Sequence, residues 1–120
     1  MAGKTAELLT VESLGNVCIV TVLARELDTT ASEELSSRLL ALLNQTKVTR
    51  YVLDFEQVRY MDSSCFGALV TFLKWLSRFD GKIALANVSE NVRFLFSVTK
   101  LDKVFPIHGS VDAAIKSVER

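Results

Sequence analysis

The sequence is poor in the residues that break or crosslink small proteins. It has one proline, five glycines and two cysteines among 120 residues. So few glycines and prolines exclude a collagen-like chain and argue against disorder. Two cysteines cannot build the disulfide framework of a small secreted domain, and no secretory signal pattern opens the sequence. We therefore expect a cytoplasmic protein with reduced thiols.

Charge of either sign is in no excess. Fourteen Lys and Arg residues balance fourteen Asp and Glu residues, and the formal net charge is zero. Binding to nucleic acid or to an anionic membrane needs concentrated positive charge, so neither partner is expected. The apolar stretch at 65–76 is too short to span a bilayer and contains Lys74. The hydrophobic content of 49% suits one core, and we expect a single domain over residues 1–120.

The spacing of apolar residues changes along the chain, which indicates alternating strands and helices. Glycine and asparagine at 15–16 predict a turn between the first two strands. The second strand is apolar on both faces and should be central in its sheet. The proline of the last strand favours a sheet edge. Strand patterns occupy residues 8–13, 17–23, 51–55, 83–86 and 104–107.

Four helices are predicted from residues that cap helix starts. Thr30 and Glu33 have the spacing of a capping box, in which each side chain satisfies a backbone amide. Further starts are predicted at 62–64, at Ser89 and at Ser110. Because strands and helices alternate after the first hairpin, the sequence predicts an α/β fold with largely parallel strands and right-handed crossovers.

The segment Asp62-Ser63-Ser64 stands between a predicted strand and a helix. Such residues commonly cap a helix, contributing about 1 kcal/mol. An exposed serine there could instead carry a phosphate, because free amides and the helix dipole favour negative charge at that end. A phosphate adds about −1.5 to −2 charge. Local chemistry alone leaves a simple cap and a phosphorylation switch both open.

Three stretches of the sequence resemble the STAS family, and the resemblance extends over residues 8–118. They are Glu26-Leu27-Asp28, the run from Val52-Leu53-Asp54-Phe55 into Tyr60-Met61-Asp62-Ser63-Ser64, and Leu101-Asp102-Lys103-Val104-Phe105-Pro106-Ile107. The resemblance implies a mixed sheet of four or five strands, with about four helices packed mainly on one face.

Small STAS proteins include bacterial anti-sigma factor antagonists, and this likeness implies partner switching. The unmodified protein would bind an anti-sigma factor that is also a serine kinase. Phosphorylation of Ser64 would release it, and a phosphatase would reset it. The implied partner surface contains Asp28, Asp62, Ser63, Ser64 and Cys65. No cofactor is implied, because ATP and metal would belong to the kinase. The alternative is a constitutive STAS scaffold or sensor subunit of a signalling complex. A weak homodimer stays open.

Three positions differ from the glycine that is common in the family: Arg25, Cys65 and Lys100. Arg25 would add positive charge to the partner surface, and Cys65 could alter how a kinase approaches Ser64. A left-handed backbone at Lys100 would cost about 1–2 kcal/mol.

Catalysis by Cys65 or a serine, assisted by the single histidine His108, is the disfavoured third possibility. We expect Cys65 to be buried, and neither a hydrolase nucleophile motif nor metal-ligand spacing is present. No catalytic or metal-binding residue is therefore assigned. Phe72, Trp75 and Phe79 recur along the helix after the serines. They could complete a core face or form an exposed partner or dimer surface.

Overall fold

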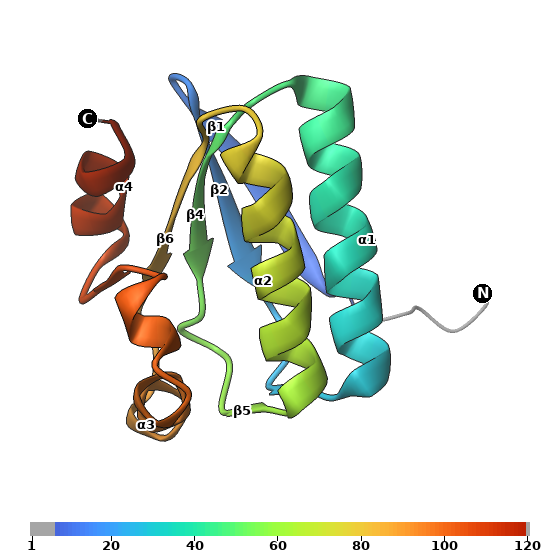
Figure 1. The fold of residues 1–120 in the computed structure, drawn as a ribbon, viewed down its shortest axis with the longest axis vertical. Coiled ribbons are helices and arrows are strands. Elements are labelled where there is room, and N and C mark those ends of the chain that lie inside the picture. Colours follow the sequence, from blue (N-terminus) through green and yellow to red (C-terminus); the bar gives the residue numbers. More distant parts are fainter. Residues whose placement is uncertain (1–6, 120) are drawn as a thin grey trace.

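A five-stranded mixed sheet runs through the middle of the molecule (Figure 1). The structure is a computed structural model that describes residues 7–119. The strand order is β1-β2-β4-β6-β7. β1 is antiparallel to β2, and the other neighbours are parallel. The predicted α/β fold is therefore confirmed. The strands are β1 (Leu9–Leu14), β2 (Val17–Val22), β4 (Arg50–Asp54), β6 (Lys82–Ala86) and β7 (Ile107–His108).

Helices cover both faces of this sheet. α1 (Thr29–Thr46) and α2 (Ser63–Ser77) share one face, and their leucines and aromatics join the larger apolar core. α4 (Val111–Glu119) packs on the opposite face through Ala114, Ile115 and Val118. α3 (Glu90–Val98) and a 3-10 turn, η1 (Leu101–Lys103), lie beyond the end of the strands (Figure 1). Only the two longer helices thus share a face.

A second, two-stranded parallel sheet joins β3 (Glu26–Leu27) to β5 (Tyr60–Met61). Each strand has two residues, which is too short for a periodic signal, so the sequence patterns missed both. Each strand also leads directly into a helix, β3 into α1 and β5 into α2. The small sheet therefore sets the beginnings of α1 and α2 beside each other.

The helix starts confirm two predicted caps and correct one. The Ser89 hydroxyl accepts from Val92 N, and the Ser110 hydroxyl accepts from Ala113 N. The capping box at Thr30 is wrong, because Asp28 is the N-cap of α1 and accepts from Ala31 N at 2.9 Å. Because Asp28 takes the capping position, α1 begins before Thr30, and Thr30 lies inside its first turn.

The chain between α3 and α4 also differs from expectation. The strand predicted at 104–107 is reduced to β7, which pairs with Leu85 and Ala86 at the edge of the sheet. Phe105 is buried instead as a core residue after η1. Lys100 has φ of 64°, which is the left-handed backbone considered for this position, at a cost of about 1–2 kcal/mol. No helix among residues 7–119 has the length and apolarity to cross a membrane.

Candidate functional site

The beginnings of α1 and α2 form one polar surface. In the small sheet Leu27 is the partner of Met61, and the amide of Asp62 donates to the Leu27 carbonyl at 3.0 Å. An aspartate follows each strand and caps each helix, Asp28 for α1 and Asp62 for α2. Because the strands are parallel, the two caps lie side by side, and the amino-terminal ends of both helices meet at this surface.

Asp62 connects the two helix starts. One carboxylate oxygen, Oδ1, accepts from Ser64 N at 2.9 Å and also from the Ser64 hydroxyl. The other, Oδ2, accepts from the Thr29 hydroxyl at 3.1 Å. Thr29 is the first residue of α1. The Asp62 side chain therefore fixes the rotamer of Ser64 and ties α2 to α1.

These hydrogen bonds lower the pKa of Asp62 below its ordinary value of 3.8. The largest cause is the Ser64 hydroxyl, and the Thr29 hydroxyl and the amides of Ser64 and Cys65 act in the same direction. All of them stabilise the ionised carboxylate more than the acid. Asp62 is therefore an anion at neutral pH, directly beside the Ser64 oxygen.

The Asp62 carboxyl is expected to titrate below 3.8 in the folded protein. Because the folded pKa is the lower one, the stabilisation by Asp62 is complete above pH 3.8 and is lost as pH falls through the folded pKa. Carboxyl-carbon NMR during an acid titration measures the midpoint. Ser64→Ala should raise the midpoint more than Thr29→Val, because the Ser64 bond has the larger effect. An unchanged midpoint in Ser64→Ala would contradict this assignment.

The four polar side chains at the two helix starts differ in their access to solvent. Ser63 and Asp28 are exposed, whereas Ser64 and Asp62 are half-buried. Ser64 is the second residue of α2, so a phosphate on it would lie at the positive end of the helix dipole. For a kinase to reach its oxygen, the hydroxyl has to turn away from Asp62, which requires only a side-chain rotation.

Cys65 does not belong to the exposed part of this surface. Its side chain is fully buried, so its assignment as a partner-contacting residue is wrong. The third residue of α2 turns its side chain inward, and the Ser32 hydroxyl of α1 acts to lower the pKa of the thiol. Burial is the main cause that raises the pKa of Cys65 to about 12. The thiol therefore has no nucleophilic thiolate at neutral pH.

His108 lies in β7, at the far edge of the main sheet, and its buried Nε2 has no hydrogen-bond partner within residues 7–119. No hydrogen bond between the described residues joins it to Cys65 or Ser64. Across residues 7–119, no group of three or more His, Cys, Asp or Glu side chains is placed to bind a metal ion.

Thr29 and Ser32 were missed by the sequence analysis. Both act on residues of the other helix start, Thr29 on Asp62 and Ser32 on Cys65. A signal was present, because Leu27-Asp28-Thr29 and Met61-Asp62-Ser63 have the same order of apolar residue, aspartate and hydroxyl. Two matching strand-to-helix junctions could have suggested that both lie at one surface.

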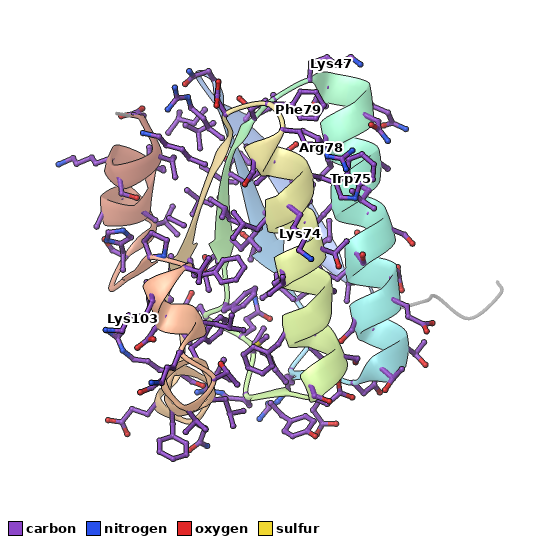
Figure 2. All side chains as sticks on the ribbon, in the orientation of Figure 1. Lys47, Lys74, Trp75, Arg78, Phe79 and Lys103 are labelled. Carbon is purple, nitrogen blue, oxygen red and sulfur yellow. The ribbon has the colours of Figure 1, made fainter. Side chains whose placement is uncertain are left out.

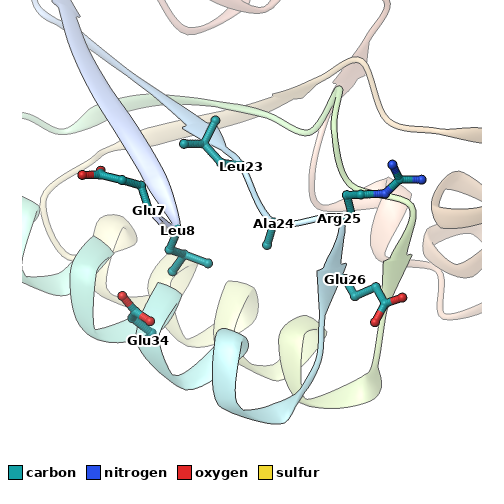
Figure 3. A pocket seen from close by; sticks show the side chains of 7 residues that line it. All are labelled: Glu7, Leu8, Leu23, Ala24, Arg25, Glu26 and Glu34. Atoms are coloured by element: carbon teal, nitrogen blue, oxygen red, sulfur yellow. The ribbon is translucent and has the colours of Figure 1, made fainter. Parts of the chain in front are cut away.

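An open hollow of about 500 Å³ adjoins β3. Leu8, Leu23 and Ala24 form its apolar part, between Glu7 and Glu34 on one side and Arg25 and Glu26 on the other (Figure 3). Arg25, which directly precedes β3, is exposed. The hollow thus extends the polar surface past the helix starts toward β1.

The aromatic residues in α2 and just after its end divide between core and surface. Phe72 is buried against Tyr51, with ring centroids 5.1 Å apart. Trp75 and Phe79 are exposed, and the Arg78 guanidinium lies 4.7 Å from the Trp75 ring centroid. Figure 2 shows these residues with Lys47 at the end of the helices away from the serines. Phe72 therefore completes the core face, and the use of the exposed Trp75 and Phe79 as a partner or dimer surface stays a prediction.

Comparison with known proteins identifies the family of this chain and several related proteins. The STAS domain profile matches residues 9–114. An anti-sigma factor antagonist homolog of Thermotoga neapolitana is 30% identical over 70 residues, which cover 58% of this chain and 62% of that protein. The chain thus spans less than two thirds of that relative's length. The anti-sigma-B factor antagonist of Bacillus subtilis is 29% identical over 94 residues, covering 78% of this chain and 84% of the relative.

Solved structures share the fold. The anti-sigma factor antagonist SpoIIAA in its unphosphorylated form aligns over 92% of this chain and 96% of its own, with a TM-score of 0.80 and 25% identity. Bacillus SpoIIAA in its phosphorylated form aligns over 92% and 98%, with a TM-score of 0.71 and 24% identity. The profile spans the sheet and both capped helix starts, and the solved relatives repeat that architecture, so the chain belongs to the STAS domain family.

Proposed function

We propose that this protein is an anti-sigma factor antagonist that switches partners through phosphorylation of Ser64. The observation that carries the proposal is the Ser64 hydroxyl, held by Asp62 on the surface shared by two helix starts. The unmodified surface, with Asp28, Asp62 and Ser63 around Ser64, binds an anti-sigma factor that is also a serine kinase. The similarity to proteins named as anti-sigma factor antagonists supports this choice of partner.

The switching reaction is a phosphoryl transfer. The kinase supplies ATP and its metal ion, and the Ser64 oxygen attacks the γ-phosphorus. An oxygen–phosphorus bond forms at Ser64, the bond between the β- and γ-phosphates breaks, and the hydroxyl proton passes to a base of the kinase. ADP leaves with the electron pair of the broken bond. Hydrolysis by a phosphatase returns the hydroxyl and releases inorganic phosphate.

Asp62 makes this surface sensitive to the modification. Its carboxylate accepts from the Ser64 hydroxyl, so a phosphate on that oxygen replaces an attractive contact with repulsion between two anions. The positive end of the α2 dipole can compensate part of this repulsion within the folded chain. A docked partner has no such compensation, because the added charge lies between the two proteins. Phosphorylation therefore acts on binding more than on folding.

A constitutive scaffold or sensor subunit is the second candidate. The observation in its favour is that Ser64 is half-buried and its hydroxyl is already bonded to Asp62, as expected of a cap. On this view the serine stabilises α2 and is never modified. The protein would then hold a signalling complex together through the same exposed surface.

Incubation with an anti-sigma factor kinase and magnesium ATP separates the two candidates. Intact-mass spectrometry should show one added phosphate, and fragment spectra should place it on Ser64. Ser63→Ala is the matched control and should still be modified, whereas Ser64→Ala should not. The absence of phosphate from both serines, with a kinase that binds the chain, would favour the scaffold.

A further inference from the structure

β1 is an edge strand of the main sheet and has no strand neighbour on its outer side among residues 7–119. Only Leu9 of its six residues is buried. Neither face of the strand's far end is covered, and Val11 and Leu14 are 42% and 54% exposed. An edge of this kind presents backbone donors and acceptors to any strand that approaches it.

The strand also lacks the features by which proteins usually protect such edges. It contains no lysine, proline or glycine, and Glu12 is its only charged residue. Its pairing with β2 is continuous from Leu9 to Leu14, so no bulge twists the edge away. Natural sheets avoid long, regular, unprotected edges because these pair with other chains. The regularity of β1 therefore points to a strand that covers it.

The hydrogen-bond pattern shows which residues are available. The Leu8 carbonyl accepts from Leu23 N at 2.7 Å, so Leu8 belongs to a hydrogen-bonded pair with β2. Inward and outward bonding alternate along an antiparallel strand. Thr10 and Glu12 therefore also bond to β2, whereas Leu9, Val11 and Ser13 direct their N–H and C=O groups to the outer edge.

We infer that two copies of this chain pair through β1 in antiparallel orientation, around a two-fold axis at Val11. In this register Val11 faces Val11 of the second copy and exchanges backbone hydrogen bonds with it. Leu9 faces Ser13, and Glu12 faces Thr10. The main sheet then continues from one copy into the other.

A second copy fits this edge better than an unrelated strand. An antiparallel strand edge is complementary to itself under two-fold symmetry, so each free donor of β1 meets a free acceptor. The register at Val11 keeps the two Glu12 carboxylates from facing each other, which would be unfavourable. The chain has no net charge that would repel a copy. None of the residues proposed to bind the anti-sigma factor belongs to β1, so the two contacts use different residues.

A stable interface usually buries at least about 1,200 Å² of accessible surface, and one pair of short strands buries less than that. The association should therefore be weak and dependent on concentration. Sedimentation velocity of the whole chain from micromolar to millimolar concentration should show the sedimentation coefficient rising toward that of a dimer. Val11→Lys places like charges opposite each other and should weaken the association about tenfold or more. Thr10→Lys, the matched control, faces Glu12 and should keep or strengthen it.

Cysteine crosslinking tests the register without relying on the stability of the lysine variants. Thr10 and Glu12 would form a cross-strand pair whose Cα atoms lie about 4.5 Å apart, within the range of a disulfide. A mixture of Thr10→Cys and Glu12→Cys chains should crosslink, and each variant alone should crosslink far less. The native Cys18 and Cys65 are buried and contribute little background.

Two results would overturn the inference. One is an unmodified chain that stays monomeric at millimolar concentration. The other is equal crosslinking by the single variants and by the mixture, because that would exclude the register at Val11.

Discussion

Phosphorylation of Ser64 is expected to weaken binding of the anti-sigma factor about a hundredfold or more, which corresponds to about 2.7 kcal/mol. The phosphate adds about −1.5 to −2 charge beside the ionised Asp62. In a docked complex this charge is removed from water, and like or unpaired charges in an interface cost several kcal/mol. Isothermal titration calorimetry with the phosphorylated chain and with Ser64→Glu measures the loss.

Two variants make this result specific to Ser64. Ser64→Ala removes the phosphate acceptor and should bind constitutively, with an affinity close to that of the unmodified chain. Ser63→Glu places similar charge one residue away, on an exposed side chain that is not bonded to Asp62, and should lose less affinity. Equal affinities of the unmodified, alanine and glutamate forms would remove the switch.

The effect of the added charge on the stability of the isolated chain can be measured separately from its effect on binding. Negative charge in the first turn of a helix is favourable by about 0.3–1 kcal/mol, whereas the neighbouring Asp62 opposes it. These effects act in opposite directions within the isolated chain, so Ser64→Glu should unfold at nearly the same urea concentration as the unmodified protein. A large loss of stability would mean that weaker binding reports unfolding.

The long elements of this fold could be predicted because each one repeats a period many times. α1 and α2 place leucines and aromatics on one side over several turns, and β2 is apolar on both faces. β3 and β5 have two residues each, and they form only because the two chain segments meet. That meeting is a tertiary event, and no local pattern in either dipeptide records it.

In the candidate site too, some roles could be predicted from neighbouring residues and others depend on contacts between distant segments. Asp62 caps its own helix, so its role could be predicted from neighbouring residues, and the same holds for the position of Ser64. The contact of Thr29 with Asp62 spans 33 positions of sequence and requires the β3–β5 pairing. The sequence predicts that Cys65 is buried, and only the resemblance to the family placed it on the partner surface. A helix turns by about 100° per residue, so the next residue after an exposed position can face the core.

Replacing Phe96 by alanine is expected to lower the free energy of unfolding by about 3–5 kcal/mol. Phe96 is fully buried in α3 and makes edge-on contacts with two rings. Its centroid lies 4.9 Å from that of Phe66 in α2 and 6.1 Å from that of Phe105. Alanine would leave a cavity and remove both ring contacts, each worth about 0.5–1.5 kcal/mol beyond area burial. Urea denaturation followed by circular dichroism measures the change.

Phe94→Ala is the matched control, because Phe94 is in the same helix and 66% exposed. It should change stability by no more than about 0.5 kcal/mol. Phe66 lies two residues after Ser64, so the contact between Phe66 and Phe96 packs α3 against the first turn of α2, on the core side of Ser64. The free energy of unfolding of a domain this size is about 5–15 kcal/mol, so Phe96→Ala should remove a large part of it. Similar losses in the two variants would show that the aromatic cluster does not hold α3 against α2.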